Sequence, residues 1–225
     1  MNSSDSNQPA PVRIVLVDDH PVVLAGYRTL LTSQAAYEVC AIASSAPAAV
    51  AAIERERPDL VLTDLTMPGR SGLDLIKDLA ALDSALKILV VSMHDETLWA
   101  ERALKAGAKG YVMKECDSST VLAAVRTVLA GGIYLSPAMS ARVLGAFAAT
   151  RPRGSSVSPL ETLSDREFEV FRLFGEGRTA KEIAAQLSIS PKTVAVHRDH
   201  IKDKLGFVTS AEMIRAAVRW VETHA

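Results

Sequence analysis

The sequence predicts an α/β domain with a doubly wound, five-stranded parallel sheet, followed by an all-α domain of four helices. The apolar runs at 14–17, 60–62 and 88–91 do not alternate with polar residues, which is typical of strands covered on both faces. Strand-like and helix-like segments alternate up to about residue 130, whereas the pattern beyond residue 160 is helical throughout.

The elements of the first domain follow one another as five strand–helix units. Pro21 suits the first turn of the first helix, and Ser71 and Asp117 are expected to cap later ones. In a doubly wound sheet, binding residues gather beyond the carboxyl ends of the strands. The expected strands are 13–17, 38–43, 60–63, 87–91 and 110–113, and the expected helices are 22–32, 47–57, 72–82, 97–106 and 119–130.

The second domain begins with a capping box. Ser164 and Glu167 have the Ser-x-x-Glu spacing, between apolar residues at staple positions. Its first helix ends near Gly175; the others are expected at 180–187, 191–205 and 210–223. Two helices joined by the short turn at 188–190 predict a helix-turn-helix arrangement.

Composition also sets the domain limits. A Pro/Gly/Ser-rich stretch at 150–159 is typical of a linker, and a short helix is expected at 137–149. We therefore predict a disordered N-terminus over 1–11, the α/β domain over 12–132, a linker over 133–159 and the helical domain over 160–225.

The composition, with 48% hydrophobic and 23% charged residues, is typical of a soluble globular protein. No apolar run approaches the roughly 20 residues that a membrane span needs, and the N-terminus lacks the apolar region of a secretory signal. We expect a cytoplasmic protein without a membrane partner, in which Cys40 and Cys116 are free thiols. Residues 1–149 carry a net charge of −3 and residues 150–225 one of +2, so charge alone does not indicate a nucleic-acid ligand.

Charged and polar residues follow four of the expected strands. Asp18 and Asp19 follow the first, Asp64 the third, Ser92 the fourth and Lys114 the fifth. Three carboxylates that meet at one edge repel one another unless a cation lies among them, and Mg²⁺ suits such oxygen ligands. This set can attack a phosphoryl donor: a carboxylate is the nucleophile, the metal ion and the lysine neutralise charge, and the serine donates a hydrogen bond.

Four motifs carry a family resemblance: Val-Asp-Asp-His-Pro at 17–21, Leu-Thr-Asp-Leu-Thr-Met-Pro-Gly at 62–69, Val-Ser-Met at 91–93 and Gly-Tyr-Val-Met-Lys at 110–114. In combination they resemble the receiver domains of two-component response regulators, which have a flavodoxin-like fold. The resemblance covers about residues 12–130.

The resemblance implies that Asp64 is the phosphoacceptor and that a sensor histidine kinase, or a small acyl phosphate, supplies the phosphoryl group. The protein would be a switch rather than a turnover enzyme, although the receiver would catalyse its own phosphoryl transfer and dephosphorylation. The other implied roles are Mg²⁺ binding by Asp18 through water and by Asp19, Asp64 and the Thr66 carbonyl directly, phosphoryl binding by Lys114, and a switch pair of Ser92 and Tyr111. His20 and His94 flank this site and are expected to shape access to it or to be solvated.

The third helix of the second domain has an apolar stripe and an opposite face suited to the major groove of DNA. Its N-terminus, where Thr193 lies and backbone N–H groups are expected to be free, suits a phosphate. The predicted DNA-binding residues are Lys181, Lys192, Thr193, Ala195, Val196, Arg198, Asp199 and Lys202.

The motifs at 163–167, 181–184, 192–198 and 204–206 resemble the LuxR/GerE-type DNA-binding domain of NarL/FixJ-type response regulators. The resemblance implies a transcription regulator that binds promoter DNA as a homodimer, with the helix near 210–220 as the dimer contact. Many relatives have basic residues where this chain has Ala195 and Asp199, and an acidic residue near phosphates weakens non-specific binding.

Alternative functions remain open at this stage. The receiver could be an inert docking or dimerisation module, and the helical domain a protein-binding bundle. A phosphoryl hydrolase is disfavoured because aspartate-nucleophile phosphatases carry a second Asp where this chain has Thr66. Phosphorylation could act by uncovering the helix at 191–205 or by joining two receivers.

Overall fold

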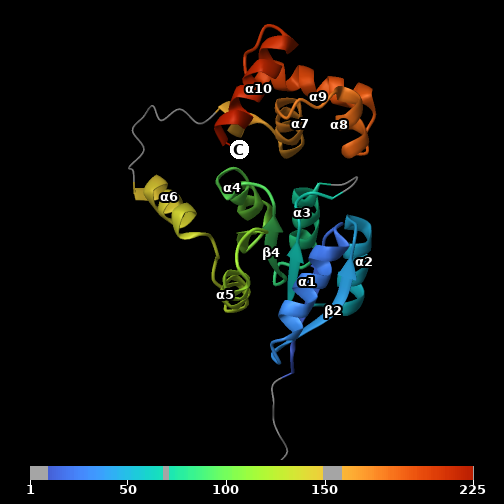
Figure 1. Ribbon diagram of the computed structural model, residues 1–225, viewed down its shortest axis with the longest axis vertical. Coiled ribbons are helices and arrows are strands. Elements are labelled where there is room, and N and C mark those ends of the chain that lie inside the picture. Colours follow the sequence, from blue (N-terminus) through green and yellow to red (C-terminus); the bar gives the residue numbers. More distant parts are fainter. Residues whose placement is uncertain (1–9, 68–70, 149–158, 225) are drawn as a thin grey trace, which may run out of the picture.

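The computed structural model describes residues 10–67, 71–148 and 159–224, and it contains an α/β domain and a helical domain (Figure 1). A five-stranded parallel sheet in the order β2-β1-β3-β4-β5 forms the centre of the first domain. The predicted fold class is confirmed. The strands are β1 (Val12–Val17), β2 (Tyr37–Ala43), β3 (Leu60–Thr63), β4 (Lys87–Ser92) and β5 (Gly110–Met113).

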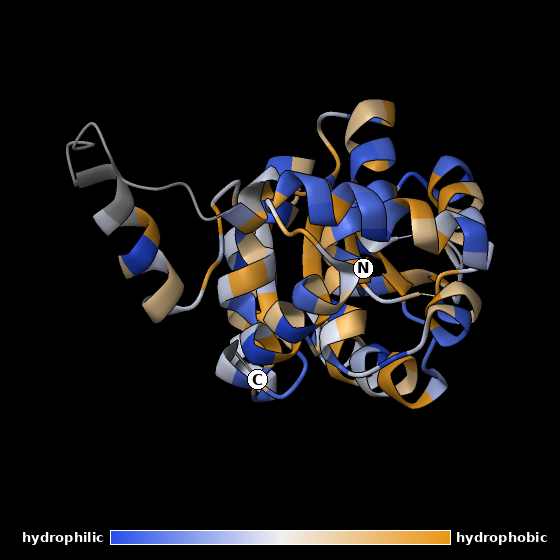
Figure 2. Cartoon of the chain, turned by 90° about the horizontal axis from the view of Figure 1, so that it is seen from above, coloured by the Kyte–Doolittle hydropathy of each residue, from blue (hydrophilic) through white to orange (hydrophobic). Residues whose placement is uncertain are grey.

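Helices cover both faces of this sheet. One hydrophobic cluster joins the sheet to α1 and α5, and a second joins it to α2, α3 and α4. Hydrophobic strands therefore lie between helices whose outer sides are hydrophilic (Figure 2). The helices are α1 (Pro21–Thr32), α2 (Ala46–Glu56), α3 (Gly72–Leu82), α4 (Glu96–Ala106) and α5 (Ser118–Leu129).

The helix starts agree with the predicted cap positions, but one of the caps lacks its hydrogen bond. Asp117 accepts a hydrogen bond from the Thr120 amide, as a cap should. Ser71 occupies the N-cap position of α3 with extended backbone, but its side chain makes no capping hydrogen bond. The predicted position of Ser71 at the helix start is therefore confirmed, but the side-chain bond of a cap is missing.

The segment after α5 packs more closely than a linker would. The Tyr111 amide donates to the Tyr134 carbonyl and the Tyr134 amide donates to the Lys109 carbonyl, so residue 134 adds a short bridge beside β5. A helix, α6 (Pro137–Ala148), follows. Most of the expected disordered N-terminus and the Pro/Gly/Ser-rich part of the linker lie outside the described residues.

The helical domain consists of a short 3₁₀ turn, η1 (Pro159–Thr162), and the helices α7 (Asp165–Gly175), α8 (Ala180–Gln186), α9 (Pro191–Lys204) and α10 (Ser210–His224). The predicted capping box is present: the Ser164 side chain accepts a hydrogen bond from the Glu167 amide, and the Glu167 side chain accepts one from the Ser164 amide. Thr179 and Glu182 form a second capping box at the start of α8. Among the described helices, none is both long and apolar enough to cross a membrane.

The helical domain lies against the α/β domain beside α3 and α4 (Figure 1). One cluster of buried side chains continues from the sheet through Trp99 on α4 to Phe168 on α7 and Met213 on α10. The two domains thus share a packed contact, next to the edge at which the strands end.

Candidate functional site

The parallel register brings the predicted acidic residues together. Val17 is paired with Thr63, and Ser92 with Met113, so the residues that follow these strands meet at one edge. Asp18 and Asp64 are buried there. Lys114 lies between them, with its Nζ atom 2.5 Å from Asp18 Oδ2 and 2.8 Å from Asp64 Oδ2.

Asp19 and His20 form the more open side of this cluster. The Nδ1 atom of His20 lies 2.8 Å from Asp19 Oδ1 and 3.1 Å from Asp18 Oδ1. Asp19 Oδ1 is buried and is not an acceptor of any well-oriented hydrogen bond among the described residues. A contact with the ring of a histidine that is 63% exposed leaves this oxygen available to a cation.

Burial and charge oppose each other at Asp64. Burial raises the pKa of the Asp64 carboxyl, whereas the hydrogen bond and the charge of Lys114 lower it. The neighbouring carboxylate of Asp18 raises this pKa further, so that it lies above the ordinary value. Burial alone would lower the pKa of Lys114, but the hydrogen bonds to Asp18 and Asp64 raise it, so the ammonium is held in its charged form.

The donor set fits a divalent cation. Asp18, Asp19, His20 and Asp64 each offer a ligand atom, and these atoms lie within 4.8 Å of one another. Three ionised carboxylates and one ammonium leave a net charge of −2 when the histidine is neutral. Carboxylate oxygens at that density of charge suit Mg²⁺, which also keeps several waters.

The predicted switch pair, Ser92 and Tyr111, lies close to the backbone of His94. The Tyr111 hydroxyl donates to the His94 carbonyl over 2.8 Å, and the His94 amide donates to Ser92 Oγ over 3.3 Å. The Thr66 hydroxyl and His94 Nε2 share a hydrogen bond of 2.6 Å. Tyr111 and Ser92 are buried, and burial raises the pKa of the phenol far above its usual value.

His94 is packed more closely than the sequence predicts. Its ring is stacked on Trp99 with a centroid distance of 5.1 Å, and it is half-buried rather than solvated. Burial, with smaller contributions from Arg172 and Lys114, lowers its pKa to about 3, so the ring is neutral at physiological pH. The sequence places a histidine in this loop but gives no sign of the aromatic partner.

A glycine fixes the loop that follows Asp64. The Gly72 amide donates to the Leu65 carbonyl, and the Leu65 amide donates to Asp64 Oδ1 over 2.6 Å. A Cβ atom on Gly72 would lie 2.5 Å from Leu65 Cα and 2.6 Å from the Asp64 carbonyl oxygen. The start of α3 can approach this loop only because residue 72 has no side chain.

Replacing Gly72 with alanine is therefore expected to lower the free energy of unfolding of the receiver by about 1–3 kcal/mol, since the added methyl group must displace backbone atoms. Gly26→Ala is the matched control, because Gly26 lies in α1 with no atom within 4 Å of the added Cβ position. Denaturant unfolding followed by circular dichroism measures both. Equal stabilities of the two variants would contradict this reading of the loop.

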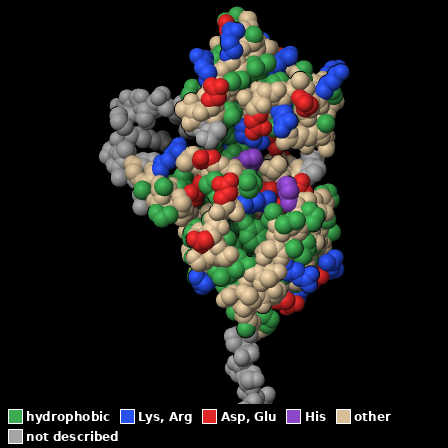
Figure 3. Space-filling view, viewed as in Figure 1, with side chains coloured by type: hydrophobic (Ala, Val, Ile, Leu, Met, Phe, Trp, Pro, Cys, Tyr) green, Lys and Arg blue, Asp and Glu red, His purple; other side chains and the backbone are tan. Residues whose placement is uncertain are grey.

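The predicted DNA-binding face lies on α8 and α9. Val194 and Ile201 of α9 are fully buried in the helical domain, which turns the opposite side outward. Lys181, Lys192, Val196 and Asp199 are exposed; Thr193, Ala195, Arg198 and Lys202 are partly exposed. On the face of this domain that Figure 3 shows, lysine and arginine side chains are interspersed with acidic ones.

Two details of this face bear on DNA binding, and the first differs from expectation. The Thr193 amide was expected to be free for a phosphate, but it donates to Ser190 Oγ over 3.0 Å, so a phosphate would compete with that cap. Arg198 lies 3.2 Å from the Asp199 carboxylate, so its charge is partly neutralised within the helix.

The chain matches two family models, one for each domain. The model described as "Response regulator receiver domain" matches residues 14–126, and that described as "Bacterial regulatory proteins, luxR family" matches residues 161–217. A five-stranded parallel receiver fold with an acidic edge, joined to a LuxR-type helical domain, defines a DNA-binding regulator of the two-component class. This chain belongs to the response regulators with a LuxR-type DNA-binding domain.

Several relatives match nearly the whole chain. The oxygen regulatory protein NreC of Staphylococcus aureus (strain JH9) is 34% identical over 211 residues, which are 92% of this chain and 97% of NreC. The crystal structure of ChrA, a response regulator of a heme-sensing two-component system, is similar at 32% identity with a TM-score of 0.51, over 93% of this chain and 98% of ChrA. RcsB of Salmonella enterica serovar Typhimurium, bound to the promoter rprA in the presence of the phosphomimetic BeF3⁻, is similar at 25% identity with a TM-score of 0.64, over 91% of this chain and 97% of RcsB. The predicted membership of the family is confirmed.

Proposed function

We propose that this response regulator accepts a phosphoryl group on Asp64 and that the modification controls its binding to promoter DNA through α9. The observation that carries this proposal is the position of Asp64, which is buried at the end of β3 within 2.8 Å of the Lys114 ammonium and beside two further carboxylates.

In the transfer reaction, an oxygen of the Asp64 carboxylate attacks phosphorus, and an O–P bond forms while the P–N bond to a kinase histidine, or the P–O bond to an acyl group, breaks. Charge that builds on the phosphoryl oxygens requires preorganised cations and donors. Lys114 supplies one charge from inside the site, and the Ser92 hydroxyl is buried at the neighbouring strand end.

Mg²⁺ is the cofactor that we propose for this site. Asp19 and Asp64 would hold it directly, Asp18 would bind it through water, and the Thr66 carbonyl would supply a further ligand. The ion would neutralise the phosphoryl oxygens and would keep Asp64 ionised against the effect of burial on its pKa.

We infer that the receiver is a switch that catalyses its own phosphorylation and a slow dephosphorylation. Thr66 carries a hydroxyl that is engaged with His94, so no acidic side chain stands at that position to assist rapid hydrolysis. A cytoplasmic location, where a sensor kinase and DNA are both accessible, agrees with this role.

The proposed DNA complex is a homodimer on paired half-sites, with α10 as the dimer contact. The promoter-bound RcsB structure is a relative that matches nearly the whole chain, which supports DNA as the ligand. The exposed outer side of α9 supports this helix as the reading helix. We propose that Lys181, Lys192, Thr193 and Lys202 contact phosphates or base edges, and that Ala195, Val196, Arg198 and Asp199 face the bases.

A footprint titration tests this function. Native protein and Asp64→Ala are titrated onto duplex DNA selected from a random-sequence pool, each with and without acetyl phosphate and Mg²⁺. The donor is expected to tighten binding of the native protein by about tenfold or more, as couplings of 1–3 kcal/mol would, and to leave Asp64→Ala unchanged.

Asp83→Ala is the matched control, because Asp83 is an exposed aspartate at the far end of α3. It should respond to the donor as native protein does. An equal donor response in Asp64→Ala would overturn the phosphoacceptor assignment, and equal binding under all four conditions would favour an inert receiver.

A further inference from the structure

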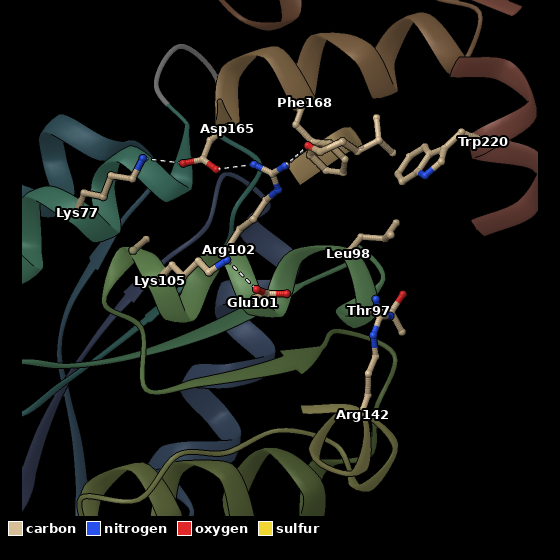
Figure 4. A pocket seen from close by; sticks show the side chains of 12 residues that line it. Lys77, Thr97, Leu98, Glu101, Arg102, Lys105, Arg142, Asp165, Phe168 and Trp220 are labelled. Carbon is tan, nitrogen blue, oxygen red and sulfur yellow. Dashed lines mark hydrogen bonds and ion pairs between the residues drawn. The ribbon is translucent and has the colours of Figure 1, made fainter. Parts of the chain in front are cut away.

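The contact between the two domains centres on Arg102 of α4. Its guanidinium donates to the Asp165 carboxylate over 2.9 Å and to the carbonyls of Leu163 and Leu160 over 3.2 and 2.9 Å. It also lies 4.3 Å from the centre of the Phe168 ring. Each of these partners belongs to the helical domain, and Figure 4 shows Arg102 pointing across the boundary toward them.

A second cation strengthens the contact from α3. Lys77 Nζ lies 2.6 Å from the other carboxylate oxygen of Asp165, so one aspartate at the start of α7 joins two helices of the receiver (Figure 4). The Arg102 side chain is only 16% exposed. Charge-assisted bonds with little exposure to water are stronger than those of surface ion pairs.

A row of aromatic rings runs beside this polar contact. His94 is stacked on Trp99, Trp99 meets Phe168 edge-on at 5.1 Å, and Phe168 meets Trp220 edge-on at 5.4 Å. The row therefore leads from the loop after β4, across the domain boundary, to α10. Aromatic pairs in this geometry attract beyond the area that they bury.

His94 is the member of the row that touches the proposed phosphorylation site. Its ring forms a hydrogen bond with the hydroxyl of Thr66, two residues after Asp64. Its amide donates a hydrogen bond to Ser92, and its carbonyl accepts one from Tyr111. Movement of these three residues would break or shift the hydrogen bonds that hold the ring and both backbone groups of His94.

The packed arrangement leaves the DNA-reading face uncovered. Lys192 and Asp199 are exposed, and Val196 is 45% exposed, while the domains are in contact. Trp220 on α10, in contrast, lines cavities shared with Leu98 of α4. The contact therefore restrains α10 and does not cover α9.

We propose that His94 couples the site around Asp64 to the helical domain: while its ring is held between Thr66 and Trp99, α4 retains α7 and α10, and displacement of the ring releases them. His94 is a positioning residue in this scheme and takes no part in phosphoryl transfer. The inference rests on the proposed function only for its natural trigger, the phosphorylation of Asp64. A Ser92 hydroxyl that turns toward a phosphoryl group would leave the His94 amide, and the loop would move with it.

Tryptophan fluorescence of the full-length protein tests the coupling, because Trp99 and Trp220 are the two tryptophans of the sequence and both lie in this row. Without any phosphoryl donor, Arg102→Ala and Thr66→Val are each expected to raise the ratio of open to closed molecules about tenfold or more, the effect of losing hydrogen bonds to charged or buried groups. Opening appears as red-shifted emission, stronger acrylamide quenching and a larger radius of gyration in solution scattering.

Two controls keep the test specific. Lys105→Ala removes an exposed cation of α4 that pairs with Glu101 within the same helix, and it should leave emission and size unchanged. Thr66→Ser retains the hydroxyl and should stay closed. If Thr66→Val stays closed while Arg102→Ala opens, coupling through His94 is overturned; if both stay closed, the contact itself is overturned.

A further measurement with beryllofluoride separates this inference from the proposed function. Beryllofluoride with Mg²⁺ should open the native protein and add little to the opening of Thr66→Val. Donor-free opening of Thr66→Val with no response of native protein to beryllofluoride would support the coupling and count against Asp64 as its trigger.

Discussion

Replacing Lys114 with alanine is expected to lower the free energy of unfolding of the metal-free receiver by about 3–5 kcal/mol at pH 7, because the removal of one partner leaves buried charge uncompensated. The Lys114 ammonium contacts two carboxylates, and the side chains of Lys114, Asp18 and Asp64 are at most 6% exposed. Denaturant unfolding in the presence of a chelator measures the loss.

Mg²⁺ should restore most of this stability, since a divalent ion among the carboxylates replaces the missing positive charge. The rescue should be absent from the double variant Lys114→Ala/Asp19→Asn if Asp19 is a ligand. Lys105→Ala is the matched control, because Lys105 is exposed and pairs within its own helix. A stability of Lys114→Ala equal to that of the control would show that the acidic cluster is not held by this lysine.

The loss in free energy of unfolding that Lys114→Ala causes should also become smaller as the pH falls. Without the ammonium, burial and the neighbouring Asp18 carboxylate raise the pKa of Asp64 in the folded state above that in the unfolded chain. A raised carboxyl pKa lowers stability at pH values above it, and this cost disappears as the pH falls below the unfolded pKa, where both states are protonated. The difference from native protein should therefore be smaller at pH 4 than at pH 7.

Gly175→Ala is expected to destabilise the helical domain by about 2–3 kcal/mol, at the upper end of the usual range for overpacking. Gly175 ends α7 where α10 crosses it, and a Cβ atom there would lie 2.5 Å from the Ala217 carbonyl oxygen and 2.6 Å from Val221 Cγ2. Backbone atoms of a packed helix cannot move aside cheaply, so α10 would have to shift as a whole.

Gly145→Ala provides the comparison, since Gly145 lies within α6 with nothing within 4 Å of the added methyl group. It should be neutral or stabilising by up to about 1 kcal/mol, the helix propensity difference between glycine and alanine. Thermal unfolding followed by far-ultraviolet circular dichroism distinguishes the two. A Gly175→Ala variant as stable as Gly145→Ala would mean that α7 and α10 are not in close contact in solution.

The acidic site was largely predictable because it depends on local order and one rule of topology. Strand-like runs end at Asp18, Asp64 and Ser92, and parallel strands of a doubly wound sheet present those ends at one edge. The ion pairs of Lys114 follow from the same rule. Helix starts were equally readable: α7 and α3 begin directly after Ser164 and Ser71, although only the Ser164 side chain bonds a nearby amide.

The sequence by itself thus determined the two domains, their elements and the residues at the sheet edge, since periodicity, caps and strand order are encoded within short stretches of chain. Only the tertiary structure decided that Arg102 reaches Asp165, that His94 is stacked on Trp99 and that Gly175 lies against Ala217. These contacts join surfaces far apart in the chain. Their geometry depends on how completed helices pack, and no local pattern of residues specifies that packing.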